Sequence, residues 1–485
     1  MQAPRPRRRD AADLEEEIRQ LREQLEQAQH RIERLERDRQ NLNQHIERLK
    51  TELEAARRKT KRAAAPFSRG KPKAHPKRPG RKPGSRYGRH HRHPRPAQVE
   101  EQISVDLPKQ CPDCGGPVEL RRVESQYQEE IVRRTVTREF RVAIGECQCC
   151  QRRVQGRHAM QTSDALGAAA VQMGPEALAL AAHLNKKMGL SLGHTAEALE
   201  VGFGLQRSRG ALYQALARLA DKAAPTYQGL VQATRQSLVN RVDETGWRVG
   251  GVPRYLWVFV SDEVTVYAIL PGRGFEQAAS VLEADYRGWL VHDGWAAYYL
   301  FGLAYHQSCL EHLIRRCREM AEIASPGAAR FPLTMKALLQ QALHTRDRYQ
   351  QDQISPHGLC TATGQLEARL DRLLAQGFRT EANRRLAKHL RHEQPHLFTF
   401  LHCPGLDATN HRAEQAIRPA VVARKVWGGN RTENGARTQQ ILMSVFRTYH
   451  QQGKDIFPRL VDLLRSPQPK TLDILPPSPP SIFDP

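Results

Sequence analysis

The feature that most limits the fold is an apolar pattern with 4-3 spacing over residues 14–53. Its members are Leu14, Ile18, Leu21, Leu25, Ala28, Ile32, Leu35, Leu42, Ile46, Leu49 and Leu53, and Arg39 is the polar residue on the same seam. No Gly or Pro interrupts the pattern. Mostly Ile at a and Leu at d predict a parallel two-stranded coiled coil, with Arg39 fixing its register. A lone helix, either solvated or packed on the rest of the chain, is the alternative. The length of the pattern favours a dimer or higher oligomer formed through residues 1–56.

A basic, proline-rich segment follows, from Arg57 to Pro96. This composition cannot bury a core, so we expect residues 57–107 to be a linker that is disordered in isolation. The first 100 residues contain 28 Lys and Arg against 14 Asp and Glu, and the whole chain carries a net charge of +23. Such an excess predicts contacts with nucleic-acid phosphates that have no sequence preference. A solvated linker is the simpler interpretation, and both can hold.

Membrane and secreted classes do not fit the sequence. No apolar run approaches the roughly 18 residues that span a bilayer, and the N-terminus lacks the apolar core of a signal peptide. Nine cysteines in such a chain indicate reduced thiols or a metal site and not a disulfide framework. We expect a cytoplasmic, nucleoid-associated protein without a membrane partner.

Two Cys-x2-Cys pairs predict a zinc ribbon over residues 108–155. Cys111 and Cys114 form one pair, and Cys147 and Cys150 form the other, with a strand-like run from Val123 to Ile144 between them. Four thiolates can hold one tetrahedral structural Zn²⁺ and leave no position open for substrate. Cys149 is an ambiguous spare. Four buried, unligated cysteines are the alternative.

Residues 160–228 predict a helical DNA-binding region. Helices are expected over Glu176–Met188, Ser191–Leu199 and Arg207–Ala224, with a Gly-containing turn before the third. Such a turn is typical of a helix-turn-helix, in which Ser208 and Arg209 would begin the recognition helix. A plain helical hairpin fits the pattern equally well.

An α/β pattern begins near residue 235 and continues to residue 455. Strands are expected over Leu238–Val242, Arg254–Val260 and Val264–Leu270, then a helix over Phe275–Tyr286 and a short strand ending at Asp293. Asp243 ends the first of these strands. In a mixed sheet of ribonuclease-H type the two Asp-bearing strands are neighbours, so both carboxylates could hold divalent cations such as Mg²⁺. An ordinary turn or capping role is the alternative for each Asp.

A third carboxylate is predicted on a later helix. Asn410, Glu414 and Arg418 are spaced i, i+4, i+8 and would share one helical face, with Asn410 and Arg418 supporting the active site. Pro419 is expected to kink or stop that helix. Residues 310–400, between the second and third carboxylates, look almost wholly helical and form an insertion. A C-terminal tail is expected over residues 456–485, and its Pro-rich part from Ser466 onward is expected to be extended.

Several ordered sequence blocks carry a family resemblance over nearly the whole chain. The chain resembles the bacterial DDE transposases of insertion-sequence family sixty-six in Val242–Arg248 (VDETGWR), Asp293–Tyr298 (DGWAAY), Cys309–Arg316 (CLEHLIRR), Ala413–Pro419 (AEQAIRP), Arg424–Arg431 (RKVWGGNR) and Gly435–Thr438 (GART). The order of coiled coil, zinc ribbon, helix-turn-helix and α/β catalytic domain with a helical insertion is also similar to that family.

The resemblance implies a DNA transposase. Asp243, Asp293 and Glu414 would be the catalytic triad and would hold two Mg²⁺ or Mn²⁺ ions. The enzyme would hydrolyse phosphodiesters at element ends, and the freed 3′-hydroxyl would attack target DNA. The family has Asp-Asn-Asn before the Glu, whereas this chain has Thr409-Asn410-His411. A dimeric, zinc-containing DNA-binding protein with a decayed catalytic centre is therefore one alternative, and a ribonuclease or resolvase of the same fold is another.

Neighbouring residues have alternative interpretations. Glu244 could replace Asp243 as a ligand, but adjacent side chains on a strand point to opposite faces, and the family pattern favours Asp243. Cys309 and His312 lie one helical turn apart and are expected to support the active site or pack in the core. Three cationic residues just beyond the catalytic helix are expected to bind DNA: Arg424, Lys425 and Arg431. A solvated basic loop is the alternative.

Overall fold

A computed structural model describes most of the chain. The described residues are 15–16, 19–20, 22–27, 29–42, 46, 98–128, 131, 135–161 and 172–476. They fall into two compact units, Met1–Arg95 and Pro96–Pro485.

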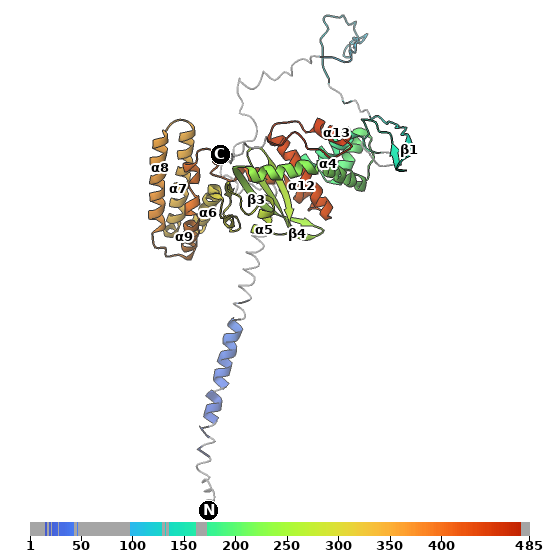
Figure 1. The fold of residues 1–485 in the computed structure, drawn as a ribbon. Coiled ribbons are helices and arrows are strands. Elements are labelled where there is room, and N and C mark those ends of the chain that lie inside the picture. Colours follow the sequence, from blue (N-terminus) through green and yellow to red (C-terminus); the bar gives the residue numbers. More distant parts are fainter. Residues whose placement is uncertain are drawn as a thin grey trace, which may run out of the picture. The chain divides into compact units, whose positions relative to one another are not determined.

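The described residues of the first unit are helical, as the heptad pattern predicts (Figure 1). Leu25, Ile32, Leu35 and Leu42 on the predicted seam are all exposed in the single chain. Association with a second copy stays a prediction. The seam positions Leu14, Ile18, Leu21, Ala28, Leu49 and Leu53 and the basic segment 57–97 lie outside the described residues.

The two cysteine pairs lie on short turns. Cys147 and Cys150 lie at the tip of an antiparallel hairpin formed by β1 (Ile144–Glu146) and β2 (Arg153–Gln155). The strand predicted from Val123 to Ile144 is wrong in the described part of that range, where the first strand begins at Ile144. An alternating apolar pattern forms a strand only where a second backbone is available to pair with it. In this segment apolar side chains such as Val123 are exposed.

The helical region is larger than predicted and joins the α/β core. It contains α2 (Pro175–Ala182) with a π-helical turn η1 (His183–Lys187), α3 (Leu192–Phe203) and α4 (Arg209–Gln236). The predicted end of the third helix at Ala224 is wrong, because α4 continues through Pro225 to Gln236. Its buried apolar residues, among them Leu230, belong to the same core as residues of the sheet. The helices therefore form one compact unit with the α/β elements.

A five-stranded mixed sheet is the centre of the second unit, in the order β5-β4-β3-β6-β7. β3 (Val239–Val249), β4 (Val252–Val260) and β5 (Thr265–Leu270) form an antiparallel meander. β6 (Trp289–His292) pairs parallel to β3, and β7 (Tyr305–Ser308) pairs parallel to β6. The predicted adjacency of the two Asp-bearing strands is confirmed.

Helices cover both faces of the meander (Figure 1). On one face a large core joins Val242, Trp257 and Phe259 to α4, α5 (Phe275–Leu282), α12 (Glu433–Gln451) and α13 (Phe457–Arg465). On the other face Trp247, Leu256 and Val258 pack against α11 (His411–Trp427).

The insertion predicted between residues 310 and 400 is helical, as expected. It comprises α6 (Leu310–Ile323), α7 (Pro326–Gln350), α8 (Pro356–Leu374), α9 (Glu381–Glu393), the short turn η3 (Gln394–His396) and α10 (Thr399–His402). These helices bury a core of their own that reaches the sheet at Val291 of β6.

Two features near the C-terminus differ in part from the predictions. Pro419 does not stop its helix: α11 runs to Trp427, because Pro419 is on the exposed side, where the lost backbone hydrogen bond can be replaced by water. The predicted tail begins with α13, whereas the described residues from Ser466 to 476 form no helix or strand, and Leu472 and Ile474 among them are buried in the main core. Residues 477–485 lie outside the described residues.

Within the described part of the chain, no helix has the length and apolar character that crossing a membrane requires.

Candidate active site

Asp243 lies in the middle of β3, so the prediction that it ends a strand is wrong. The strand continues to Val249 because β4 pairs with its whole second half, through Trp247 and Arg248. Asp243 pairs across the sheet with Val258, which belongs to the core under α11. Its side chain therefore shares the sheet face that α11 covers.

Asp293 follows the last residue of β6, as predicted, and lies level with Asp243. The parallel pairing of β3 and β6 aligns Arg241 with Val291, and each Asp lies two residues beyond this pair, Asp243 within β3 and Asp293 just after the end of β6. Neighbouring strands are about 4.8 Å apart, so this register brings the two carboxylates to one edge of the sheet. Asp293 Oδ1 accepts a hydrogen bond from the Trp295 amide at 3.0 Å, which holds the turn that follows.

Glu414 lies in the first turn of α11, and Asn410 fixes the start of this helix against β3. The Asn410 side-chain amide donates to the carbonyl of Val242 at 2.7 Å, and its backbone N–H donates to Cys309 Sγ at 3.1 Å. The Asn410 carbonyl accepts the backbone N–H of Glu414 at 3.0 Å. A buried asparagine thus links the residue before Asp243 to the helix that carries Glu414.

The Asp243 carboxylate is buried among other acidic groups. The pKa of Asp243 is raised to about 7, first by burial, then by the negative charge of Glu244, with smaller contributions from Asp293 and Glu414. Like charges this close disfavour ionisation in the absence of a cation. A cation bound among them would reverse this effect, because oxygen ligands in their charged form suit hard divalent ions.

Glu244 is held on the opposite face of the sheet. It pairs across the sheet with Trp257, which belongs to the large core with Tyr298. Its carboxylate forms an ion pair with Arg273 and accepts a hydrogen bond from the Tyr298 hydroxyl, and only 1% of the side chain is exposed. The geometry agrees with the expectation that adjacent carboxylates on β3 point in opposite directions.

Arg273 is a neighbour of the site that sequence reasoning missed. Besides Glu244, its guanidinium approaches Asp293 Oδ2 at 3.7 Å and lies 4.0 Å from the ring centroid of Trp295. Arg273 follows β5 in a turn without a distinctive motif, so only the folded arrangement reveals that it bridges the two acidic segments.

A buried arginine network fixes the loop before α11. Arg241, only 1% exposed, pairs with Asp407 and with Asp262, the latter at 3.0 Å. Arg412 approaches the same two carboxylates, at 2.9 Å from Asp262 and 3.6 Å from Asp407. This network ties β3 to the segment that leads into Asn410 and Glu414.

Cys309, His312 and Glu414 form a second possible metal group. One donor atom from each lies within 4.8 Å of the other two, and His312 Nε2 is 3.6 Å from Glu414 Oε1. Sequence reasoning considered Cys309 and His312 together but did not find their third partner, which comes from a helix about 100 residues later. A thiolate, an imidazole and a carboxylate suit Zn²⁺, whereas Mg²⁺ prefers oxygen ligands only.

Glu393 in α9 is another residue without a sequence signal. It is buried beneath the turn that follows Asp293: a Cβ added to Gly294 would meet its carboxylate oxygens at 3.2 and 3.3 Å. Its Oε2 accepts hydrogen bonds from Tyr299 and Ser308. The helical insertion therefore contacts the segment that carries Asp293.

The predicted DNA-binding and supporting cations are distributed over several places. Arg424 donates to Thr245 Oγ1 at 3.0 Å and to the Gly246 carbonyl, so it is attached to β3. Lys425 is exposed. Arg418 is exposed and lines a cavity of about 400 Å³ on the outer side of α11.

Ser208, Arg209 and Arg431 line a larger cavity of about 1060 Å³. These residues were predicted to bind DNA from two distant parts of the sequence, the start of the third helix and the loop after Glu414. In the fold they line the same cavity. Ser208 Oγ accepts from the Ala211 amide at 3.1 Å and caps α4.

The cysteine pairs each form a local turn that favours thiolates. Backbone N–H groups directed at Cys111 and at Cys147 lower the pKa of each thiol. Gly115 has a φ of +74°, which permits the first turn. Within the described residues, the two pairs are not gathered into one group of ligand atoms. A shared zinc ion stays a prediction.

The class of protein follows from the fold and the acidic cluster together. A mixed α/β sheet that carries several carboxylates at one edge is typical of enzymes that hold divalent cations. Residues 170–438, more than half of the chain, match the sequence model of the Transposase IS66 family. The protein belongs to this transposase family, and the matched region contains Asp243, Asp293 and Glu414. No curated protein matches the chain.

Proposed function

We propose that the protein is an active DNA transposase that cleaves and joins phosphodiesters with Asp243, Asp293 and Glu414. The observation that carries this proposal is the register of β3 and β6, which aligns the two Asp residues, together with the anchoring of α11 beside them through Asn410. The family membership supports the transposase role.

The sheet order supports a ribonuclease-H-like catalytic domain. Three antiparallel strands are followed by two parallel strands added on the side of the first strand. The first strand, β3, is therefore central and carries Asp243, and the fourth, β6, ends just before Asp293. The helix that supplies Glu414 packs on the same face as Asp243.

The donor set fits divalent cations. The pKa of Asp243 is raised by burial and by neighbouring carboxylates, among them Asp293 and Glu414, so a bound cation would relieve their mutual repulsion. Two Mg²⁺ or Mn²⁺ ions held there would activate the attacking oxygen and stabilise the leaving oxygen of a phosphodiester. Asp243 and Asp293 would contact both or one of the ions, and Glu414 would complete the second.

The chain's own groups would orient this chemistry. Asn410 holds Glu414 at a fixed distance from β3, and Arg273 restrains Asp293 from the other side. In the first reaction water attacks phosphorus and the bond to the 3′ oxygen at the element end breaks, leaving a 3′-hydroxyl and a 5′-phosphate. In the second reaction this hydroxyl attacks a target phosphate and displaces a target 3′-hydroxyl.

End cleavage tests the proposal. The substrate is a DNA fragment carrying the short inverted repeats that flank the gene, incubated with purified protein and Mg²⁺. Asp293→Asn should lose cleavage by at least about a hundredfold, because the variant loses a charged metal ligand. Asp285→Asn, an exposed residue, is the matched control and should cleave like the wild type. Wild-type activity of Asp293→Asn would refute the assignment.

The alternative is a DNA-binding protein of the same family whose catalytic centre has decayed. The residues Thr409 and His411 beside Asn410 motivate it, because the family has acidic and amide residues there. Binding of the repeats without cleavage by the wild type at any divalent metal would favour this alternative.

The N-terminal elements would deliver DNA to the catalytic domain. We propose that residues 1–56 form a coiled-coil dimer and that Cys111, Cys114, Cys147 and Cys150 hold one structural Zn²⁺. Metal analysis after dialysis should give about one zinc per chain. Absence of zinc would refute this ligand set.

A further inference from the structure

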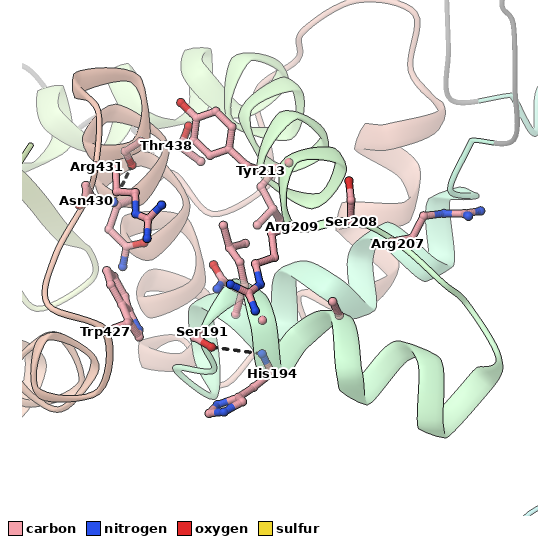
Figure 2. A pocket seen from close by; sticks show the side chains of 18 of the residues that line it. Ser191, His194, Arg207, Ser208, Arg209, Tyr213, Trp427, Asn430, Arg431 and Thr438 are labelled. Carbon is pink, nitrogen blue, oxygen red and sulfur yellow. Dashed lines mark hydrogen bonds between the residues drawn. The ribbon is translucent and has the colours of Figure 1, made fainter.

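The larger cavity is enclosed by elements from three parts of the chain. Its lining comes from η1, from the beginnings of α3 and α4, and from the loop after α11 with the start of α12 (Figure 2). Its volume is about 1060 Å³. Figure 2 shows Arg209 of α4 and Arg431 of the loop on opposite sides of the space.

Positive side chains dominate the cavity. Its cationic residues are Lys186, Arg207, Arg209 and Arg431, with His194 beside them, against the acidic Glu197 and Glu200. Arg209 packs across the start of α3, where its Nε lies 3.4 Å from the Cβ position of Gly193. The Lys186 amine donates to the amide oxygen of Gln439, and no ion pair of Lys186 is found among the described residues.

Three helices begin at this cavity. Ser191, Ser208 and Thr432 are the N-caps of α3, α4 and α12, and all three line it. Each cap accepts one backbone N–H, so further N–H groups of the first turns remain available. Neither α3 nor α4 has an acidic residue in its first turn, whereas α12 has Glu433 there. Helix N-termini without acidic neighbours attract anions.

Two buried polar atoms at the cavity have no hydrogen-bond partner among the described residues. Thr438, which is 3% exposed, has an unpartnered hydroxyl, and Arg207 has an unpartnered Nε. Burying such groups without a partner is costly, so they indicate a missing polar ligand. This observation is independent of the helix N-termini.

The lining also suits the bases of a nucleic acid. Tyr213 and Trp427 are half-buried aromatic residues at the cavity. Stacking on aromatic rings beside a basic groove is how unpaired strands are held without sequence preference. The cavity, at about 1060 Å³, is far larger than one phosphate requires.

A second cavity extends this surface along α11. It shares Asn185, Lys186, His194 and Gln439 with the first and is also lined by Gln415 and Arg418. Gln415 follows Glu414 directly. From Glu414 to Trp427 the helix is about 20 Å long, at 1.5 Å per residue. The two cavities therefore follow α11 from its catalytic end to its far end.

We propose that these two cavities bind an unpaired segment of the DNA substrate, with phosphates at Arg209, Arg431 and the N-termini of α3 and α4 and bases at Tyr213 and Trp427. This inference rests on the proposed function and extends it to a strand-binding site away from the carboxylates. It also assigns the start of α4 to an unpaired strand in place of the major groove of a duplex.

Photocrosslinking tests the position of the strand. A single-stranded oligothymidylate with photoreactive thymidines is irradiated with the full-length protein in the absence of divalent metal, and the crosslinked peptides are identified by mass spectrometry. Crosslinks are expected in the peptides that contain Tyr213 and Trp427. Crosslinks confined to the basic segment 57–97 would overturn the proposal.

Binding measurements test the charges. Arg209→Ala combined with Arg431→Ala should weaken binding of the oligothymidylate about tenfold or more at physiological salt. In a plot of log affinity against log salt concentration, the slope of the double variant should be smaller in magnitude by about 1.4, because each lost phosphate contact on a single strand contributes about 0.7. Arg218→Ala, an exposed arginine on the same helix, is the matched control. Thermal unfolding confirms that the variants fold, and Arg209→Lys should keep most of the binding.

Three outcomes would contradict the inference. Unchanged binding by the double variant would remove the site, and an equal loss of duplex binding would show a general electrostatic effect. Binding of inorganic phosphate as tight as that of the oligonucleotide would identify a small-anion site. The binding experiments contain no divalent metal, so their result does not depend on cleavage. If the protein binds the strand at this site but never cleaves DNA, the inference stands and the proposed function is refuted.

Discussion

Asp243 in β3 and Asp293, the residue after the neighbouring parallel strand β6, each lie two residues beyond the pair formed by Arg241 and Val291. This register depends on the backbone hydrogen bonds between β3 and β6 and not on the carboxylates themselves. It therefore fixes the spacing of two acidic side chains that would otherwise repel each other. Glu414 lies in the first turn of α11, and Asn410 ties the start of that helix to the backbone of β3.

Replacing Asn410 should weaken both the fold and the site. Asn410→Ala removes the hydrogen bond to the Val242 carbonyl, which then stays buried without a partner, so we expect a loss of about 1–3 kcal/mol in the free energy of unfolding. Cleavage should fall further than stability explains, because Glu414 loses its anchor. Urea unfolding and single-turnover cleavage measure the two effects. Asn434→Ala, at an exposed position, is the control; equal stability of the two variants would contradict the role of Asn410.

Gly294 should not tolerate a side chain. Its φ is +86°, and an added Cβ would meet the Glu393 carboxylate. Gly294→Ala should therefore cost about 1–3 kcal/mol and reduce cleavage by displacing the adjacent Asp293. Gly302→Ala is the matched control, because a Cβ there would meet nothing within 4 Å. Thermal unfolding and cleavage assays compare the pair, and indistinguishable variants would show that the turn adapts.

The buried arginine network should be important for stability. Arg241→Met leaves Asp407 without its main partner, and breaking a buried ion pair of this kind costs about 3–5 kcal/mol. Denaturant unfolding should show this loss relative to Arg218→Ala. A cost below about 1 kcal/mol would mean that Arg412 alone can hold the loop before α11.

Much of this arrangement follows from sequence patterns, and the rest depends on contacts between distant residues. The expected strands over Arg254–Val260 and Val264–Leu270 correspond to β4 and β5, and the helical character of the insertion was also expected. The length of β3 was not predictable from local sequence, because its second half contains Glu244 and Arg248 and is a strand only through pairing with β4. The Arg241–Asp407 pair joins residues 166 positions apart. Cys309 and His312 gain Glu414 as a neighbour only after folding.

Strand binding should depend on pH through Lys186. Burial lowers the pKa of Lys186 from 10.5 to about 7. The charged groups that line the same cavities are Lys187, Glu197, Glu200, Arg207, Arg209, Arg418 and Arg431, with His194. The ammonium form is lost as pH rises through 7, so affinity for the oligothymidylate should decrease between pH 6 and pH 8, and Lys186→Met should remove that part of the change.

The stability of the protein without DNA should change in the opposite direction. Between about pH 7 and pH 10 the unfolded chain keeps the Lys186 proton that the folded protein has released, so raising the pH favours the folded state. Thermal unfolding of the wild type and of Lys186→Met across this range measures the contribution. Identical pH profiles for the two proteins, in both binding and unfolding, would contradict the role of Lys186.

Zinc should inhibit cleavage by competing for Glu414. The Cys309, His312 and Glu414 donors suit Zn²⁺ and would withdraw Glu414 from the other carboxylates. His312→Asn should need about tenfold more Zn²⁺ for the same inhibition, measured with Mg²⁺ held constant. Equal zinc sensitivity of the variant and the wild type would place the inhibitory ion elsewhere.

The central claim is that Asp293 contacts a catalytic metal ion beside Asp243, and a change of metal tests it most directly. A thiolate binds Mg²⁺ poorly but accepts softer ions such as Mn²⁺. Asp293→Cys should therefore cleave element ends poorly with Mg²⁺, and its cleavage rate with Mn²⁺ should be at least about tenfold higher than with Mg²⁺. The wild type and the control Asp285→Cys should respond equally to both metals. Full activity of Asp293→Cys with Mg²⁺, or no recovery with Mn²⁺ in a variant that folds, would contradict the claim.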